Sequence, residues 1–131
     1  MTQDGLSGLF KKEFNKPSDL LCCAFGLRSS EIDTYFALLS GEKTVEELTA
    51  VVRRDRSTVQ RILTQLYSKG LVERETRYFE RGGHYYVYRG VSTERVRKEI
   101  LDQLEQWYRN TRTFLLKSWP GSSQPAREMT T

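Results

Sequence analysis

Apolar residues recur at helical spacing in two short stretches between residues 44 and 69. The first stretch contains the apolar positions Val45, Leu48, Val51 and Val52. Thr44 precedes these positions and Glu47 follows it by three residues, which is the spacing of a capping box. The pattern therefore predicts a helix that begins directly after Thr44.

The second stretch has apolar residues at positions i, i+3, i+4 and i+7, namely Val59, Ile62, Leu63 and Leu66. A turn of about 100° per residue gathers them on one face of a helix. Asp55 precedes this helix, and we expect its carboxylate to accept hydrogen bonds from the amides of the first turn. Lys69 and Gly70 predict the end of the helix, because glycine readily adopts the left-handed conformation.

The opposite face of the second helix carries hydroxyl, amide and guanidinium groups. They belong to Ser57, Arg61, Thr64 and Ser68, with Gln60 and Gln65 at the flanks. No Asp or Glu occurs from residue 56 to residue 69. These polar groups suit hydrogen bonds to base edges and phosphates in a major groove, where a carboxylate would repel the DNA backbone.

Two alternating segments, 71–80 and 84–90, follow the second helix and are rich in residues typical of strands. Between them, Gly82 and Gly83 allow a sharp turn. The order helix, turn, helix and hairpin predicts a winged helix-turn-helix. In such a fold we expect Arg77, Arg81 and His84 to reach phosphates or an adjacent minor groove; the alternative is a solvated hairpin with ordinary surface arginines.

The segment from Ser57 to Val72 resembles the recognition helix and first wing strand of the TrmB-like and MarR-like winged-helix transcriptional regulators, especially archaeal ones. The similarity extends upstream to Gly26 and downstream to Tyr88. It implies a DNA-binding regulator of transcription. TrmB-like proteins often carry a separate sugar-binding domain for which this chain is too short, so the resemblance implies no sugar. The possibility of a small ligand pocket at a dimer interface, as in MarR-like proteins, is left open, and any effector is unknown.

The longest helical pattern begins after Ser92. Its apolar positions are Val96, Ile100, Leu104, Trp107, Thr111 and Phe114, widened by Leu101, Tyr108 and Leu115. A helix of about 24 residues extends roughly 36 Å, more than a small core can cover. We therefore predict a homodimer through Val96, Ile100, Leu104, Trp107, Tyr108 and Phe114. The competing account folds this helix back onto its own core.

The first part of the chain predicts three further elements. An arm over 1–17 has Leu6, Leu9, Phe10 and Phe14 at helical spacing and is expected to pack on its own protein or a dimer partner. Ser18 is expected to cap a short helix that ends at Gly26. Ser29 or Ser30 is expected to cap a supporting helix that ends at Gly41. The residues of the supporting helix expected to face inward are Ile32, Tyr35, Phe36, Leu38 and Leu39.

Composition places the chain among globular proteins that can bind nucleic acid. Its 131 residues are 37% apolar and 29% charged, with a net charge of +4. The calculated isoelectric point of about 9.2 permits DNA binding without requiring it. We predict a mostly α protein with a small β-hairpin (α+β), composed of an arm (1–17), a winged helix-turn-helix domain (18–91), a dimerisation helix (92–119) and a disordered tail (120–131). No signal peptide or membrane-spanning pattern is present in the sequence, so we expect a cytoplasmic protein without a membrane partner.

The two cysteines are adjacent in the apolar run 20–25. Their spacing suits neither a zinc knuckle nor a disulfide between elements. We expect Cys22 and Cys23 to be buried small hydrophobes. The alternative is a thiol redox sensor, which requires an exposed cysteine.

Catalytic and metal-binding patterns are missing from the sequence. His84 is the only histidine, and it lacks the neighbouring ligands of a metal site. We find no nucleophile elbow, phosphate-binding glycine loop or paired carboxylates with an adjacent base. We therefore predict a protein that is not an enzyme and uses no metal or cofactor.

The sequence thus predicts a homodimeric, sequence-specific regulator that binds double-stranded DNA. The expected DNA-binding residues are Arg53, Arg54, Arg56, Ser57, Thr58, Gln60, Arg61, Thr64, Gln65, Arg77, Arg81 and His84. The alternative is a winged-helix module that binds another protein through the aromatic residues of its hairpin. The absence of carboxylates from the outer face of the second helix favours DNA.

Overall fold

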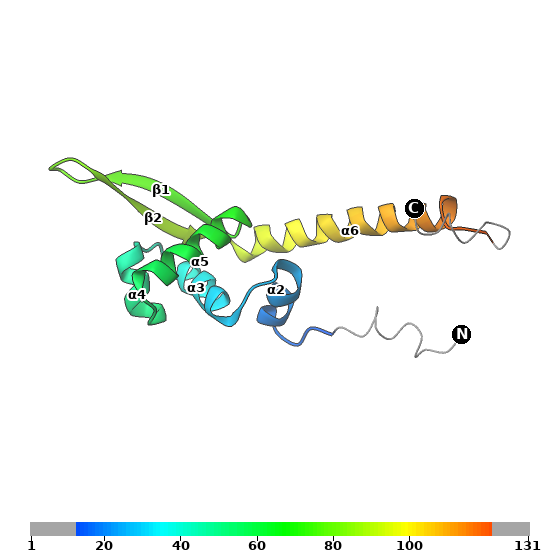
Figure 1. Cartoon of the computed structure of the whole chain (residues 1–131), viewed down its shortest axis with the longest axis horizontal. Coiled ribbons are helices and arrows are strands. Elements are labelled where there is room, and N and C mark those ends of the chain that lie inside the picture. Colours follow the sequence, from blue (N-terminus) through cyan, green and yellow to red (C-terminus); the bar gives the residue numbers. More distant parts are fainter. Residues whose placement is uncertain (1–12, 122–131) are drawn as a thin grey trace. The chain divides into compact units, whose positions relative to one another are not determined.

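The computed structural model describes residues 13–121, which form two separate parts (Figure 1). The described portion of the first part runs to Ser92 and contains four helices and a hairpin. The described portion of the second part begins at Thr93 and contains one long helix. Most of the predicted arm, and the tail after residue 121, lie outside the described residues.

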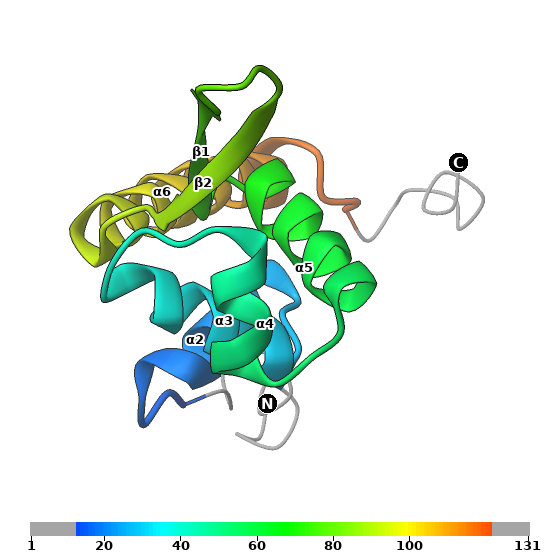
Figure 2. The same cartoon turned by 90° about the vertical axis from the view of Figure 1, so that its left-hand side faces the viewer.

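The helices of the first part are α2 (Pro17–Phe25), α3 (Ser29–Leu39), α4 (Val45–Val52) and α5 (Arg56–Ser68). Their buried faces enclose a core that includes Tyr35, Leu38 and Leu48 together with the apolar face of α5. Figure 2 shows α3, α4 and α5 grouped below the base of the hairpin. All four predicted apolar positions of α5 are buried, which confirms the 3.6-residue pattern.

The predicted caps of α4 and α5 are confirmed. Thr44 Oγ1 accepts from the Glu47 amide at 3.2 Å, while Glu47 Oε1 accepts from the Thr44 amide at 3.0 Å. The Asp55 carboxylate accepts from the Thr58 amide at 3.3 Å. These bonds satisfy amides that have no partner within their helices, so local sequence defines where both helices begin.

The predicted caps of α2 and α3 are wrong. Helix α2 starts two residues earlier than a cap at Ser18 would allow, at Pro17, with Lys16 in the cap position. Proline suits the first position of a helix because its fixed φ is already helical and its missing amide has no helical partner there. Helix α3 already includes Ser29 as its first residue, after Arg28, and no side chain caps it.

Phe36, which is predicted to face the core, is exposed instead, and an apolar residue of α4 is exposed as well. The phenyl ring of Phe36 lies on the outer side of α3, beside the buried Tyr35, with ring centres 5.7 Å apart. Val51 in the last turn of α4 is also exposed. Both helices are short and contact the core through a narrow stripe, so a broad apolar pattern overestimates how much of each surface is covered.

The prediction that the two cysteines are buried is wrong, because both Cys22 and Cys23 are exposed. Helix α2 buries Leu21. At about 100° per residue, the next two side chains point away from the direction of Leu21. Exposure is one requirement of a thiol sensor, so that hypothesis stays a prediction.

The hairpin consists of β1 (Val72–Tyr78) and β2 (His84–Gly90), paired antiparallel from Val72 opposite Gly90 to Tyr78 opposite His84. Gly82 and Gly83 both have positive φ values, 92° and 84°, which confirms the predicted glycine turn. Lys43 joins the edge of β2 through two backbone hydrogen bonds with Tyr88, at 2.9 and 2.8 Å.

Contacts at the base of the hairpin hold it against α3. The hydroxyl of buried Tyr35 donates to the Val91 carbonyl at 2.8 Å. A Cβ added to Gly90 would come within 3.2 Å of the Leu39 backbone nitrogen, so a larger residue would require Leu39 to shift by a few tenths of an ångström. The position of the hairpin beside the helices is therefore set by close packing at its base.

The second part of the structure is α6 (Thr93–Lys117), close in length to the predicted helix. Val96 is its buried residue, and Ile100 is half-buried. Leu104, Trp107, Tyr108 and Phe114 are each more than half exposed in the single chain. The helix therefore presents a long apolar stripe to its surroundings.

Candidate nucleic-acid interface

Helix α5 presents an exposed polar face. Gln60, Arg61 and Thr64 are exposed, and Gln65 is half-buried at one flank. Thr64 Oγ1 donates to the Gln60 carbonyl one turn earlier at 2.9 Å, as hydroxyl groups within helices commonly do. Arg61 has no hydrogen bond or ion pair within residues 13–121, so its guanidinium is available for an external acceptor.

The hydroxyl groups in the first turn of α5 form hydrogen bonds within the chain. Ser57 Oγ and Thr58 Oγ1 both donate to the carboxylate of Asp55, the latter at 2.6 Å. These hydrogen bonds lower the pKa of Asp55 to about 2, with Ser57 the largest contributor. The hydroxyl protons of Ser57 and Thr58 are therefore engaged, and each oxygen still has lone pairs that can accept a bond.

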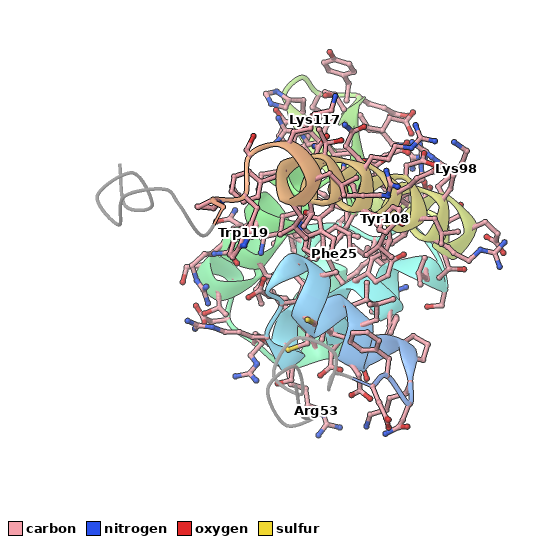
Figure 3. All side chains as sticks on the ribbon, turned by 90° about the vertical axis from the view of Figure 1, so that its right-hand side faces the viewer. Phe25, Arg53, Lys98, Tyr108, Lys117 and Trp119 are labelled. Atoms are coloured by element: carbon pink, nitrogen blue, oxygen red, sulfur yellow. The ribbon has the colours of Figure 1, made fainter. Side chains whose placement is uncertain are left out.

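The predicted arginines fall into two groups. Arg53, Arg54, Arg61 and Arg81 are exposed and have no ion pair within the part of the chain that the structure describes. Arg53 closes α4 in the left-handed region, with φ 56°, and projects from the turn before α5 (Figure 3). Arg56 instead forms an ion pair with Glu46 of α4.

Arg77 belongs to a four-residue ion cluster on one face of the hairpin. It donates to Glu42 at 2.8 Å and lies 3.4 Å from Glu75. Arg89 approaches the same two carboxylates at 3.5 and 3.6 Å. The hydrogen bond to Glu42 raises the pKa of Arg77 further above its already high ordinary value. The positive charge of Arg77 is thus partly balanced by its neighbours. We call these residues (Glu42, Glu75, Arg77 and Arg89) the ion-paired face.

The other face of the hairpin carries Arg74, Thr76, Tyr78, His84 and Tyr86, because residues opposite each other in the register share a face. We call this set the aromatic face. The Arg74 guanidinium lies 4.5 Å from the ring centre of Tyr67 in α5 and 4.7 Å from that of Tyr86. Arg74 therefore links the end of α5 to the wing through cation–π contacts.

Sequence reasoning did not assign a role to the Tyr67–Arg74 contact or to Glu42 and Glu46. Alternation along β1 places Arg74 and Tyr78 on one face, which is a signal in the sequence. The meeting of Tyr67 with Arg74 is not predictable from spacing, because the two residues lie on different elements joined by a turn. The pairing of Glu42 with Arg77 likewise joins residues 35 positions apart.

Two kinds of feature are absent from the described residues. None of the helices there is long and apolar enough to cross a membrane. Within the same residues, no group of three or more His, Cys, Asp or Glu side chains is placed to hold a metal ion.

Comparisons with known proteins agree with the fold. Residues 21–94, more than half of the chain, match the family model described as the sugar-specific transcriptional regulator TrmB. Two uncharacterised proteins of Methanocaldococcus jannaschii are similar: one is 36% identical over 76% of this chain and 73% of its own length. The other is 42% identical over 74% of this chain and 81% of its own length.

A solved structure from Methanosarcina mazei Go1, described as a possible transcriptional regulator, superposes with a TM-score of 0.68 at 26% identity. The alignment covers 84% of this chain and 92% of that protein. The family model covers more than half of the chain, and this match carries the assignment. The chain belongs to the TrmB family of winged-helix transcriptional regulators.

Proposed function

We propose that this regulator binds double-stranded DNA sequence-specifically as a homodimer, with α5 of each protomer in a major groove. The observation that carries the proposal is the outer face of α5, where Gln60, Arg61 and Thr64 are exposed and no carboxylate occurs in the helix. Amide and guanidinium groups of this kind form paired hydrogen bonds with adenine and guanine edges. Because the proposed ligand is DNA, we expect the protein to act in the compartment that contains the DNA.

The residues divide into two roles. Gln60, Arg61, Thr64 and Gln65 read bases, and Ser57 and Thr58 lie beside the DNA backbone at the start of the helix. Arg53, Arg54, Arg56, Arg77, Arg81 and His84 supply affinity that does not depend on sequence. Within the second group, Arg53, Arg54 and Arg81 contribute most, because they have no ion pair among residues 13–121, whereas Arg56 and Arg77 share their charge with intramolecular carboxylates.

Dimerisation is proposed through α6. The apolar stripe of Leu104, Trp107, Tyr108 and Phe114 is exposed in the single chain, and Val96 and Ile100 continue it toward the start of the helix. Exposed apolar surface of this extent is typical of an interface. A two-fold dimer would place its recognition helices about one turn of DNA, or 34 Å, apart.

Two substitutions test the division of roles. Arg61→Ala should cost about 1 to 3 kcal/mol on a specific site and relax sequence preference there. Arg81→Ala should weaken all duplexes about equally and reduce the salt slope of the dimer by about 2, about 1 for each protomer. Fluorescence anisotropy on a random duplex and on the gene's own upstream region, at several salt concentrations, distinguishes the two effects. Equal losses on both duplexes for both variants would refute α5 as the base-reading element.

The second candidate is a protein-interaction module, favoured by the exposed aromatic residues Tyr78 and Phe79 at the end of the hairpin. Wild-type protein that binds neither duplex at low salt would make this candidate the first choice.

A further inference from the structure

The aromatic face of the wing is a continuous row of rings. The centres of Tyr78 and His84 are 6.4 Å apart, those of His84 and Tyr86 are 5.6 Å apart, and the pairs meet edge to face. Arg74 continues the row from Tyr86 to Tyr67 on α5. The row therefore runs from the recognition helix to the outer end of the hairpin.

The outer end of this row is open to solvent. Tyr78 is 76% exposed, and Tyr67 at the inner end is 46% exposed. Tyr78 contacts His84 through a ring edge, so much of its surface is available to another flat group. A tyrosine side chain is rigid, with only two torsions, so stacking on its ring costs little conformational entropy.

Charge is divided between the two faces of the hairpin. The carboxylates of Glu73 and Glu75 alternate onto the side of the ion-paired face, where Glu42 adds a third. The aromatic face has no carboxylate among its strand residues and includes Arg74 and His84. A face with aromatic rings, positive charge and no acid matches the chemistry of nucleic acid, which offers flat bases beside phosphates.

The position of Tyr67 connects this face to the proposed base-reading surface. At about 100° per residue, Tyr67 falls on the same flank of α5 as Gln60 and Thr64. DNA seated against that flank would meet Tyr67 and Arg74 next and the wing beyond them. This continuity favours nucleobases over a protein as the group that contacts Tyr78.

We propose that the aromatic face of the wing stacks on nucleobases flanking the site read by α5, with the Tyr78 ring inserted between neighbouring base pairs in the minor groove. This inference rests on the proposed DNA-binding function. Side chains inserted in this way partly unstack a base step and bend the duplex toward the major groove. The wing would then select flanking steps that unstack easily, such as TA, without a hydrogen bond to their bases.

The first experiment measures affinity on two duplexes taken from the upstream region. One extends beyond the segment that the protein protects from nuclease, and the other is trimmed so that the wing has no bases to contact. Tyr78→Ala should lower affinity for the long duplex on the order of tenfold and leave affinity for the trimmed duplex unchanged. Tyr78→Phe should retain wild-type affinity, because the ring and not the hydroxyl makes the contact.

The second experiment detects unstacking directly. The fluorescent base 2-aminopurine, placed in turn at each flanking position, should brighten at one step when wild-type protein binds and stay quenched with Tyr78→Ala. Phe36→Ala serves as the control, since it removes an exposed phenyl ring from α3, which belongs to neither the proposed base-reading helix nor the wing. It should behave as wild type in both experiments.

Failures of the two proposals are distinguishable. If wild-type protein binds the duplexes but Tyr78→Ala matches it in affinity and in 2-aminopurine signal, the wing inference is wrong while DNA binding stands. The aromatic face would then be assigned to a protein partner. If wild-type protein binds no duplex at low salt, both proposals are overturned. If Tyr78→Phe loses as much affinity as Tyr78→Ala, stacking is refuted in favour of a hydroxyl contact.

Discussion

Asp55 shows how one exposed side chain organises the start of α5. Its carboxylate accepts from the hydroxyls of Ser57 and Thr58 and from the Thr58 amide. The same three bonds fix the rotamers of two residues proposed to lie at the DNA backbone. The cap thus couples the stability of α5 to the geometry of its first turn.

The pKa of Asp55 makes this coupling measurable. Because its pKa is lowered from 3.8 to about 2 in the folded protein, the charged cap stabilises the fold above about pH 4. That contribution should be lost as pH falls from about 4 to about 2. Asp55→Asn keeps a capping acceptor but cannot titrate, so its urea midpoint should decline less than that of wild type over this range. If the urea midpoints of the two proteins declined equally over this pH range, the stabilising role of the ionised Asp55 cap would be contradicted.

In the proposed DNA complex, Glu42 limits the positive charge that the hairpin offers to DNA. It binds both Arg77 and Arg89, and all of these side chains are partly exposed to solvent. Glu42→Gln should therefore raise affinity for random duplex several-fold and steepen the salt slope, because Arg77 and Arg89 each lose one of two carboxylate partners and one negative charge is removed. Salt-dependent anisotropy checks this. Glu99→Gln on α6 is the matched control, since it removes one carboxylate from an element outside the wing and should change binding little.

At the scale of elements, α5 is held by its apolar face and by its neighbours. The four apolar residues of this face are essentially inaccessible to solvent, whereas Val51 in α4 is 54% exposed. At the end of α5, Lys69 Nζ donates to the Phe25 carbonyl at 2.8 Å, which connects α5 to α2. Contacts with the core and with α2 therefore fix the orientation of α5.

Truncation of Ile62, which is 0% exposed, should lower the free energy of unfolding by about 2 to 5 kcal/mol, because Ile62→Ala leaves a cavity in the core. Val51→Ala is the matched control and should change the free energy by less than about 1 kcal/mol. Urea denaturation monitored by circular dichroism measures both. Similar losses for the two variants would mean that α5 does not pack as described.

At the scale of the whole molecule, the two parts differ in how much of their apolar surface is buried. The winged-helix part encloses its own core, while α6 buries Val96 and exposes most of its apolar stripe. Charged side chains on the polar side of α6 pair with each other, for example Lys98 with Asp102 at 3.2 Å. Figure 3 draws the α6 side chains, including Tyr108 and Lys98. A second copy of the chain is the proposed partner for the stripe.

Replacement of Trp107 by glutamate should convert the proposed dimer to a monomer, because it would place a charge in an apolar interface. Sedimentation velocity measures the change in mass. The salt slope of DNA binding should fall to about half, since each monomer contacts half of the phosphates. Lys98→Gln on the polar side should remain dimeric. A wild-type protein that sediments as a monomer would contradict the proposal at once.

Much of the architecture follows from local sequence. Thr44 with Glu47, Asp55, and the paired glycines at 82 and 83 determine where elements begin and turn, because each acts on backbone within a few residues of itself. The 3.6-residue pattern of α5 determines which face is buried. The same pattern leaves the opposite face polar, so the exposed surface of the recognition helix is predictable from the sequence alone.

Only the tertiary structure decided which charged and aromatic side chains meet. Arg74 lies between Tyr67 and Tyr86 because α5 packs beside the hairpin. Glu42 binds Arg77 because the neighbouring Lys43 pairs with β2. The exposure of Cys22 and Cys23 has the same origin, since a helix that touches the core along one narrow stripe leaves apolar neighbours outside. Periodicity specifies the faces of an element, whereas packing specifies what each face contacts.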